Sequence, residues 1–579
     1  MKLVEALEAL NESPRPESPV LEIHLACGFT PLHFLTFLNA HLRREFPEHK
    51  IAVETGWFGD LPGNLERLER AQDSAVVAIM EWQDLDPRLG IRQLGGWAPR
   101  QLGDIAQNVR GQAARFSASL ESIARRNSVT VVLPTLPLPP VAFTPGWLLS
   151  PFESELRELV AGLASRLGRS PGIRLVSPQR LDRGSPCATR FDVKSELSTG
   201  FPYSLSHADN LAAVIAHIIR NPVAKKGLIT DLDDTLWMGV LGEVNVEGIS
   251  WDLDHRAQRH GLYQQMLASL AAAGILLAVA SKNDPALVEE AFRKANPILP
   301  RDRIFPLEVN WGPKSASVLR ILQTWNVSAD SVVFIDDSPL DLAEVKNAHP
   351  EMECLRFPRD DDKAAYQLLE DLRDMFGKSS LSAEDEIRLD SIRASHTFIE
   401  ATRTLEYTPE YFLREAEGKL TVSFLKHPTD PRALDLINKT NQFNLNGKRH
   451  TELSWKQYLS EANVFLLVAS YEDKFGPLGK IAVVAGRSDN RRLSLDHWVM
   501  SCRAFSRRIE HACLLHLFQK FDAREAAVDF LFTARNGPLR DFFAEILGSV
   551  PQTSFSMTRQ QLLDNCPPIF LRVQEPSDE

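Results

Sequence analysis

The sequence has little cysteine, no excess of basic residues and no long apolar run. Its six cysteines are spread over 579 residues, and none of their spacings is that of a zinc site or of a CxxC redox motif. A chain of this length also needs no disulfide framework to hold its core together. The formal net charge of −11 disfavours general nucleic-acid binding, because that function needs a basic surface to neutralise phosphates. We therefore expect no disulfide scaffold and no nucleic-acid partner.

The apolar runs are too short for a membrane-spanning helix. The longest run lies near residues 270–280 and has about a dozen residues, whereas a spanning helix needs roughly 20. The first residues, MKLVEALE, contain early acids and no apolar core of signal-peptide length. These features predict a cytoplasmic protein without a membrane partner.

The length and the hydrophobic pattern predict three domains, at 1–222, 223–378 and 379–579. The chain is too long for one hydrophobic core. In the first two domains, apolar runs alternate with helical patterns, which predicts parallel sheets with helices on both faces. In the third, the predicted strands follow one another more closely, which favours a mixed α+β sheet. The overall fold class is therefore α/β with an α+β domain at its end.

The boundaries of the expected elements follow from apolar periodicity and from turn residues. Strands are expected at 20–26, 50–54, 74–81, 128–133, 227–230, 275–280, 331–335, 420–425, 464–471, 479–485, 493–501 and 527–532. Helices are expected at 31–46, 64–71, 101–126, 153–167, 385–402, 431–439, 505–518 and 539–547.

Two carboxylates follow the strand predicted at 227–230. Asp231 and Asp233 are two residues apart on the loop that leaves this strand, so both can face one cavity. One carboxylate can attack phosphorus while the other protonates the leaving group, as paired carboxylates do in acid–base catalysis. This pair is therefore a candidate for phosphoryl transfer.

Two further segments offer groups that can hold a phosphoryl group. Ser281 follows the strand predicted at 275–280, where its hydroxyl can bind a phosphoryl oxygen. Lys314 can neutralise the negative charge that a nucleophilic carboxylate and a phosphate share. Both are expected to lie beside the paired carboxylates.

A third pair of acids completes a candidate metal site. Asp336 and Asp337 follow the strand predicted at 331–335 and, with Asp231, form a hard oxygen site suited to Mg²⁺. Asp341, one helical turn further on, is interpreted as a solvated or capping carboxylate.

These residues carry a family resemblance. The segment DLDDTLW at 231–237 resembles the first motif of the haloacid dehalogenase superfamily, and Ser281, Lys314 and the Asp336–Asp337 pair are similar to its second, third and fourth motifs. The resemblance implies a Rossmann-like domain in which Asp231 is the nucleophile and Asp233 the acid and base.

The same resemblance implies the metal ligands and the substrate contacts. Mg²⁺ is expected between Asp231, the carbonyl of Asp233 and Asp336, with Asp337 also in the metal set. Around this site, the side chains expected to contact the substrate are those of Thr235 and Asn283.

Three segments resemble the FkbH-like branch of this superfamily. They are LWMGVLGE at 236–243, LINKTNQFN at 436–444 and SCR at 501–503, and the resemblance covers roughly residues 224–575. The implied activity is that of a glyceryl transferase and phosphatase of polyketide-type biosynthesis. Such an enzyme dephosphorylates D-1,3-bisphosphoglycerate and loads the glyceryl unit onto the phosphopantetheine thiol of an acyl carrier protein.

The resemblance also implies the flanking folds, and it leaves two other functions open. The N-terminal domain would be SGNH-hydrolase-like and the C-terminal domain acyl-CoA N-acyltransferase-like. One alternative function is a Mg²⁺-dependent phosphatase of a small metabolite, with the acyltransferase-like domain as an accessory. Another is a non-catalytic scaffold that docks a carrier protein.

Cys502 is a candidate covalent nucleophile. An acyl phosphate is already activated, so a thiolate can displace its phosphate to form a thioester. Cys502 lies at a predicted strand-to-helix junction beside Arg503, and both a helix N-terminus and a nearby cation favour a thiolate. The alternative is a packed cysteine, with Arg503 binding the phosphate or the carrier arm.

Asparagines and one histidine stand out in the last domain. Asn438, Asn441 and Asn444 recur at a spacing of three and are interpreted as a polar stripe facing the acyl group, because three amides on one face are costly to bury without a ligand. A helix end rich in caps is the alternative. His497 falls within a predicted strand and is interpreted as a structural histidine.

Two departures from the implied folds limit the expected ligands. The segment RAFSRR at 503–508 lacks the glycines with which acyl-CoA-type folds bind pyrophosphate, so CoA itself is not expected to bind. The segment CGFT at 27–30 occupies the strand end where an SGNH hydrolase places its serine, and Cys27 is not an evident substitute. The N-terminal domain is therefore expected to be non-hydrolytic and to serve as a docking surface.

Overall fold

The computed structural model describes most of the chain, in two compact units. The described residues are 1–11, 18–70, 74–94, 96–141, 143–378, 381–404, 409–426, 430–440, 442–450, 452–533 and 536–576, with the backbone alone at 399–404, 409, 412, 431, 452, 453 and 502. The units are Met1–Val223 and Ala224–Glu579, so the three-domain division stays a prediction. In the described part, no helix is both long and apolar enough to cross a membrane.

The first unit is built on a five-stranded parallel sheet in the order β2-β1-β3-β4-β5. Its strands are β1 (Val20–Cys27), β2 (Lys50–Thr55), β3 (Ala75–Ile79), β4 (Ser128–Val132) and β5 (Ile173–Leu175). The strand order changes direction between β1 and β3, and open α/β sheets place ligands outside the carboxyl ends of strands at such a point.

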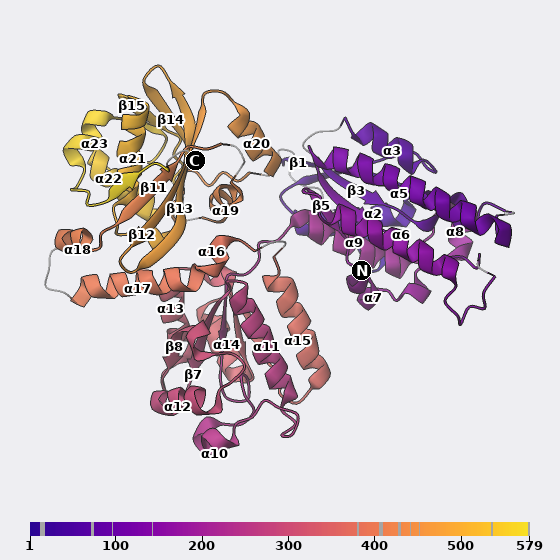
Figure 1. The fold of residues 1–579 in the computed structure, drawn as a ribbon, viewed down its shortest axis with the longest axis horizontal. Helices are drawn as coiled ribbons and strands as arrows, with labels where there is room; N and C mark the ends of the chain where they lie inside the picture. Colours follow the sequence, from indigo (N-terminus) through magenta and orange to yellow (C-terminus); the bar gives the residue numbers. More distant parts are fainter. Residues whose placement is uncertain are drawn as a thin grey trace. The chain divides into compact units, whose positions relative to one another are not determined.

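Helices cover both faces of this sheet, as the alternation of apolar runs predicts (Figure 1). One face packs against α1 (Leu3–Asn11), α2 (Leu32–Glu45) and α9 (Leu205–Arg220). The other packs against α3 (Leu61–Leu68), α5 (Leu102–Ala124) and α6 (Pro151–Leu167). The connections contain α4 (Trp82–Leu85), α7 (Pro178–Gly184) and α8 (Val193–Thr199).

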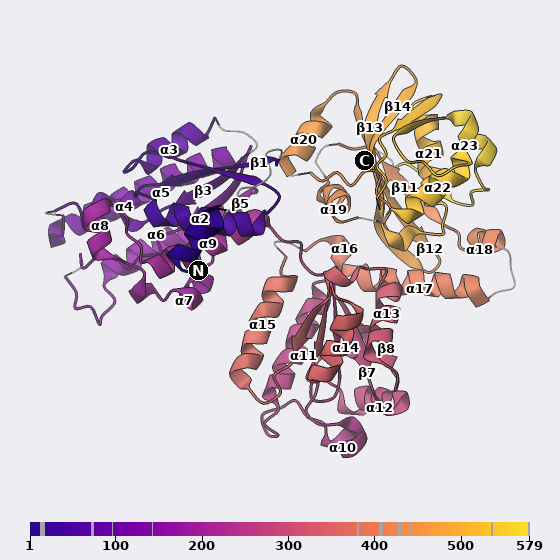
Figure 2. The same cartoon turned by 180° about the vertical axis from the view of Figure 1, so that it is seen from behind.

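The second unit begins with another parallel sheet, in the order β10-β9-β6-β7-β8. Its strands are β6 (Gly227–Thr230), β7 (Leu276–Ser281), β8 (Ile304–Val309), β9 (Val332–Asp336) and β10 (Glu353–Arg356). One face carries α10 (Leu241–Gly248), α11 (Gln258–Ala272), α12 (Pro285–Ala295) and α15 (Asp362–Phe376), and the other carries α13 (Lys314–Trp325) and α14 (Pro339–Ala348). Helices α11 and α15 lie side by side in both views (Figures 1 and 2).

The rest of the second unit forms a seven-stranded mixed sheet in the order β16-β15-β14-β13-β12-β11-β17. Its strands are β11 (Lys419–Ser423), β12 (Val464–Asp473), β13 (Gly476–Asp489), β14 (Arg492–Met500), β15 (Glu525–Val528), β16 (Phe555–Thr558) and β17 (Arg572–Gln574). Its helices are α16 (Ala383–Glu386), α17 (Arg388–Thr404), α18 (Pro409–Glu415), α19 (Pro431–Lys439), α20 (Glu452–Ser460), α21 (Ile509–Lys520), α22 (Gly537–Leu547) and α23 (Arg559–Asn565). The pairs β14–β15 and β11–β17 are parallel and the others antiparallel, so the mixed α+β prediction is correct.

Two boundaries in this sheet differ from the sequence prediction for visible reasons. The helix expected at 505–518 begins only at Ile509, because Ser506 and Arg508 have positive φ and cannot continue a right-handed helix. The strand expected at 527–532 ends at Val528 because the chain then bonds elsewhere, with the Leu531 N–H donating to the Leu445 carbonyl.

Candidate active site

The acidic and basic residues singled out in the middle of the chain meet at one edge of the sheet β10-β9-β6-β7-β8. Asp231 follows β6 directly, Ser281 ends β7 and Asp336 ends β9, while Lys314 begins α13 after the loop that leaves β8. These are all carboxyl ends of parallel strands, which lie at the same edge of a sheet. The Asp231 N–H donates to the Ile335 carbonyl at 3.0 Å and fixes the first loop against β9.

Lys314 is a buried cation between two buried carboxylates. Its Nζ lies 2.9 Å from Asp231 Oδ2 and 2.6 Å from Asp336 Oδ2. Burial alone would lower the pKa of Lys314, but the charges of Asp231 and Asp336 outweigh it, and the pKa of the ammonium is raised. Lys314 therefore stays charged at any physiological pH and holds the two carboxylates close together.

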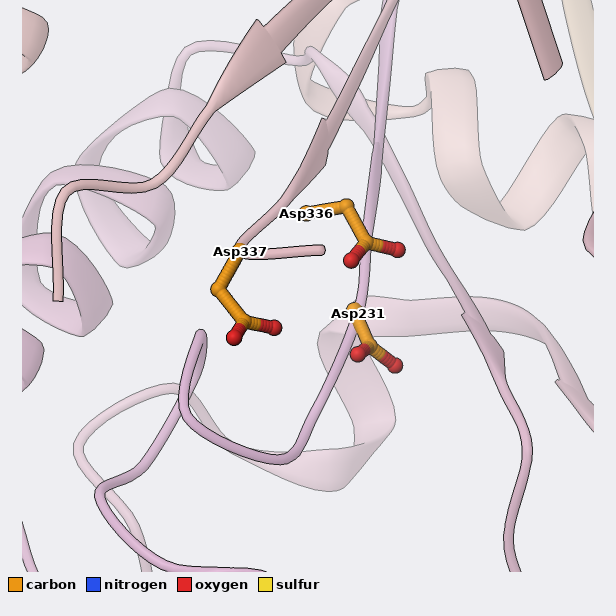
Figure 3. Close-up of side chains that lie close together, drawn as sticks. All are labelled: Asp231, Asp336 and Asp337. Carbon is orange, nitrogen blue, oxygen red and sulfur yellow. The ribbon is translucent and has the colours of Figure 1, made fainter. Parts of the chain in front are cut away.

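Three carboxylates converge beside this lysine. Ligand oxygens of Asp231, Asp336 and Asp337 all lie within 4.8 Å of one another, and Figure 3 shows them facing a common space. Burial and the charge of Asp231 raise the pKa of Asp336, with Lys314 acting in the opposite direction. Burial and Asp231 likewise raise the pKa of Asp337. The cluster thus carries more negative charge than Lys314 alone neutralises.

One oxygen atom of this carboxylate cluster lacks a hydrogen-bond partner within the described part of the chain. This atom is the buried Oδ1 of Asp231. A buried carboxylate oxygen without a partner costs free energy, whereas a hard cation bound by oxygen ligands would satisfy it. The side chains of Asp231, Asp336 and Asp337 therefore fit a magnesium ion, and the carbonyl of Asp233 is the fourth predicted ligand.

Asp233 has a different set of hydrogen-bond partners from Asp231. Its Oδ1 accepts hydrogen bonds from Trp237 Nε1 at 3.0 Å and from the Leu241 N–H at 3.1 Å, and its Oδ2 accepts from Asn283 Nδ2 at 2.9 Å. Burial raises the pKa of Asp233, although the Leu241 and Trp237 bonds oppose the rise. A raised pKa suits a carboxyl group that must carry a proton part of the time.

The other predicted contacts of this site have defined places. Thr235 is fully buried and its Oγ1 accepts from the Asp337 N–H at 3.1 Å, so it joins the Asp231 loop to the end of β9. Asn283 is held by its bond to Asp233. Ser281 is buried at the end of β7, and its carbonyl accepts from the Asn310 N–H at 3.1 Å. The substrate contacts expected of Thr235 and Asn283 stay predictions.

Asp341 is neither the solvated nor the capping carboxylate that the sequence suggested, because Ser338 caps α14 and the Asp341 side chain pairs with lysines. Its Oδ1 pairs with Lys282 Nζ at 2.7 Å and its Oδ2 lies 3.5 Å from Lys314 Nζ. Burial would raise its pKa, but the bond from Lys282 prevails and the pKa of Asp341 is lowered. The cause of the error is that α14 starts directly after Asp337, with Ser338 as its N-cap, so its first turn faces the site.

Arg359 is a residue of this site that the sequence did not reveal. Its Nη1 lies 3.2 Å from Asp234 Oδ2 and 3.1 Å from Asp337 Oδ2, and its side chain is 46% exposed. It follows β10, an edge strand of only four residues that the apolar pattern did not predict. With β10 unrecognised, the loop after it could not be assigned to the carboxyl edge.

The segment around Cys502 forms a short 3-10 helix, Cys502–Ala504, directly after β14. The side chain of Cys502 lies outside the described residues, so its covalent role stays a prediction. Arg503 is buried, with Nη1 donating to Ser391 Oγ at 3.1 Å and Nε to Ser501 Oγ at 3.3 Å. Arg503 thus packs against α17, and its contact with a substrate stays a prediction.

The asparagine motif bonds to the chain itself. Asn438 on α19 bridges the backbone of His450, accepting from its N–H at 2.9 Å and donating to its carbonyl at 2.8 Å. Asn444 lies in an extended segment bridged to Val499, so these two asparagines do not share one helix face as the spacing suggested. Asn441 lies outside the described residues. Both Asn438 and Asn441 stay predictions as substrate contacts.

The extended segment 443–446 occupies the space where β14 and β15 separate. These strands pair only from Arg492 to Leu495 on the β14 side. Beyond that point, the Leu445 N–H donates to the Trp498 carbonyl at 3.0 Å, and Asn446 Nδ2 donates to the Asp496 and Asp529 carbonyls at 2.8 and 3.2 Å. The segment 443–446 thus fills the gap between β14 and β15.

His497 is a buried histidine with a defined partner. Its Nε2 lies 3.1 Å from Nε2 of His450. Burial is the main cause that lowers the pKa of His497 to about 3, so the ring is neutral at physiological pH. A neutral, hydrogen-bonded ring fits the structural role expected of it.

The strand end after β1 in the first unit holds a thiol without nucleophilic character. Cys27 is buried, its Sγ lies 3.3 Å from the Phe29 carbonyl, and burial raises its pKa to about 12. A thiol with this pKa is protonated at neutral pH and does not attack. The non-hydrolytic character of the whole domain stays a prediction.

The comparisons with known proteins show the fold but not the family. No family model and no curated protein matches the chain. Among solved structures, the N-terminal part of the protein BF1531 from Bacteroides fragilis, which contains a phosphatase domain and is complexed with Mg, matches with a TM-score of 0.52 and 19% identity, covering 66% of this chain and 100% of that chain. An uncharacterized protein from Corynebacterium glutamicum gives a TM-score of only 0.19 at 16% identity, over 27% of this chain and 98% of that one.

Proposed function

We propose that this protein is a Mg²⁺-dependent phosphatase of the haloacid dehalogenase type, with Asp231 as its nucleophile. One observation carries the proposal: Asp231 is buried with Oδ2 held by Lys314, while Oδ1 has no partner among the described residues and faces two further carboxylates. The magnesium in the phosphatase-domain structure from Bacteroides fragilis supports the choice of metal.

The side chains divide the work of phosphoryl transfer between them. Asp231 attacks the phosphorus, and Lys314 neutralises the charge that would otherwise keep phosphate away from a carboxylate. Asp233 donates a proton to the leaving oxygen and later accepts one from the attacking water. When bound by Asp231, Asp336, Asp337 and the Asp233 carbonyl, Mg²⁺ supplies positive charge against the phosphoryl oxygens.

The finer proposal is a glyceryl transferase and phosphatase that resembles the FkbH-like branch. The segments at 236–243, 436–444 and 501–503 support it. In this proposal the protein is cytoplasmic, uses D-1,3-bisphosphoglycerate, and delivers the glyceryl unit to the phosphopantetheine thiol of an acyl carrier protein through Cys502 and Arg503.

The test uses the full chain with Mg²⁺, D-1,3-bisphosphoglycerate and a phosphopantetheinylated carrier protein. We expect phosphate release and, by intact-protein mass spectrometry, a carrier bearing a glyceryl thioester. The Asp231→Asn variant should release no phosphate from the ester, whereas the exposed control Asp254→Asn should behave as wild type. An unmodified carrier together with normal phosphate release would reject the glyceryl transfer and leave the phosphatase.

A phosphatase of a small metabolite is the second candidate. Two observations on the described residues of the last domain favour it: Arg503 is buried and bonded to Ser391, and the chain itself fills the gap between β14 and β15. Phosphate release from D-1,3-bisphosphoglycerate at the same rate with and without the carrier protein would support this candidate.

A further inference from the structure

The phosphoryl site and the Cys502 segment lie at opposite ends of one sheet. Asp231, Ser281 and Asp336 stand at the carboxyl ends of β6, β7 and β9. Helices α16 and α17, by contrast, contact the amino ends of the same sheet. Arg388 Nη1 on α17 donates to the Gly274 carbonyl at 3.1 Å, two residues before β7 begins.

Further contacts fix α17 at this amino end. Ile392 belongs to the apolar cluster that contains Leu276, the first residue of β7. The ring of His396 lies 5.5 Å from the ring of Phe305, the second residue of β8. Position 274 requires glycine, because its φ is +76° and a Cβ there would lie 2.3 Å from the Asp385 carbonyl oxygen. The glycine therefore allows α16 to pack closely against this end of the sheet.

The Cys502 segment also packs against α17. Ser391 accepts a hydrogen bond from Arg503 Nη1 at 3.1 Å, and Ser395 Oγ donates to the Arg503 carbonyl at 3.4 Å. On a helix with 3.6 residues per turn, Ser391 and Ser395 lie about 100° around the axis from Ile392 and His396. The short helix Cys502–Ala504 therefore meets α17 on a face next to the one that contacts the amino end of the sheet.

These contacts allow the distance between Asp231 and the Cys502 segment to be estimated. Strand β7 alone, with 6 residues, spans about 17 Å at 3.3 Å per residue. Asp231 lies beyond one end of this sheet and α17, with the Cys502 segment, beyond the other, so the two are at least about 17 Å apart and a glyceryl unit cannot contact both at once.

Residues at the rim of the phosphoryl site are partly exposed, and residues 224–378 contribute no inserted domain above them. In residues 224–378, all of which the structure describes, the chain between the Asp231 loop and α11 holds only the short helix α10. The connection from β8 to α13 is the four-residue segment 310–313, so no inserted domain covers the carboxyl edge. Asp234, Asp337 and Arg359 keep 25%, 15% and 46% of their side-chain surface exposed. A substrate attached to a larger molecule can enter such a site.

We propose that the phosphoryl site acts on a phosphate ester carried by the acyl carrier protein, so that the phosphoglyceryl thioester, and not a free metabolite, is its substrate. This rests on the glyceryl transfer proposed above. The carrier's flexible arm would then connect two sites that the fold keeps apart. The site at Asp231 needs to admit only the phosphorylated end of the thioester.

The bonds in this sequence balance without any further reactant but water. The Cys502 thiolate attacks the carbonyl of the acyl phosphate, a C–S bond forms, the C–O bond to phosphate breaks, and inorganic phosphate leaves with the electron pair. The phosphopantetheine thiol of the carrier then attacks this thioester, a new C–S bond forms, the bond to Cys502 breaks, and Cys502 leaves as a thiolate while the thiol proton passes to inorganic phosphate. The carrier then presents the remaining ester, and Asp231 attacks its phosphorus while the P–O bond to the glyceryl oxygen breaks. Asp233 protonates that oxygen, and water hydrolyses the aspartyl phosphate.

The experiment separates the two steps in time. In the first stage, the full-length Asp231→Asn protein receives D-1,3-bisphosphoglycerate, Mg²⁺ and the phosphopantetheinylated carrier. In a parallel reaction, EDTA blocks the phosphatase step of the wild-type protein without a mutation. The carrier is then isolated and weighed by intact-protein mass spectrometry. In the second stage, fresh wild-type protein with Mg²⁺ receives this carrier alone, with Asp231→Asn protein as the control.

We expect a carrier heavier by a phosphoglyceryl group after the first stage, and loss of only the phosphoryl group in the second, with no change in the control. An unmodified carrier in the first stage, while wild type forms the glyceryl thioester in one step, would overturn the proposal. So would a phosphoglyceryl carrier that wild type leaves intact. Failure of wild type to load any carrier would instead reject the glyceryl transfer itself.

Discussion

The chain contains two five-stranded parallel sheets, and their carboxyl edges are filled in opposite ways. In the first unit, Glu81 is buried and accepts from Thr135 Oγ1 at 2.6 Å, from Tyr203 Oη at 2.7 Å and from the Leu136 N–H at 3.1 Å. His207 lies between Thr135 Oγ1 at 3.0 Å and Ser185 Oγ at 2.8 Å. Each of these groups has its partners within the chain.

The middle sheet has the same architecture but an incomplete set of partners. Its carboxylates share Lys314, and Asp231 Oδ1 has no partner in the described part of the chain. The comparison teaches that the strand arrangement does not decide function. A carboxylate such as Glu81, whose two oxygens are satisfied from within, contributes to stability. An unsatisfied carboxylate such as Asp231, which stands beside two further carboxylates, is prepared for a cation.

The sharpest way to break the comparison is to change the side chain at the corresponding strand end of each sheet. The Asp231→Asn variant should lose at least about 1,000-fold in phosphatase activity, since loss of a covalent nucleophile has effects of this size. Cys27→Ala at the corresponding strand end should change activity less than twofold, within about 0.4 kcal/mol. Phosphate release under saturating Mg²⁺ measures both. Equal losses in the two variants would contradict the account.

Removal of the buried cation should cost stability as well as activity. Lys314→Met leaves Asp231 and Asp336 without their shared partner, and breaking a buried pair costs about 3 kcal/mol or more. The matched control is Lys282→Met, because Lys282 pairs with Asp341 but is 37% exposed, and its loss should cost less than about 1 kcal/mol. Urea unfolding in EDTA measures both values, and a larger loss for Lys282→Met would refute the assignment.

A substitution of Glu81 in the first unit should change the free energy of unfolding but not the catalytic rate. Glu81→Gln places an NH₂ group among donors and should lower the free energy of unfolding by about 2 kcal/mol. The rate of phosphate release at a temperature where both proteins are folded should not change. A fall in turnover without a fall in stability would show that this edge takes part in the reaction.

A further prediction concerns how the stability of the first unit responds to acid. Burial lowers the pKa of His207 to about 3, below its usual 6.5, so the unfolded chain binds more protons between these values. The stability from neutral His207 is therefore complete above pH 6.5 and declines as the pH falls, by about 1.4 kcal/mol per pH unit for this group. The His207→Asn variant should show a shallower decline in urea unfolding between pH 6 and about 4. An unchanged slope would contradict the buried neutral ring.

The elements with long buried apolar runs could be predicted from the sequence. The strands at 227–230, 275–280 and 331–335 match β6, β7 and β9 within a residue, and the acids after them could be placed at one edge. The expected residues of this edge meet in the structure because parallel strands bring their carboxyl ends together. Their catalytic roles stay predictions.

The other elements and site residues could not be predicted, because they depend on tertiary contacts that local sequence patterns do not reveal. Strands β5, β8 and β10 were not predicted, because β5 has three residues and β8 and β10 are largely half-exposed edge strands. Arg359 and the Lys282–Asp341 pair were missed with them. The asparagines at 438 and 444 looked like one face because their spacing assumes a continuous helix, whereas α19 ends at Lys439.

The most direct test of the account is to trap the phosphorylated enzyme. The full chain with Mg²⁺ is quenched in acid within milliseconds of receiving a phosphate ester, then digested and analysed by mass spectrometry. The account predicts a phosphoryl group on Asp231 that is absent in EDTA, and none on the peptides of the first unit. Turnover of the ester without phosphorylated Asp231, or with the phosphoryl group on another residue, would contradict it.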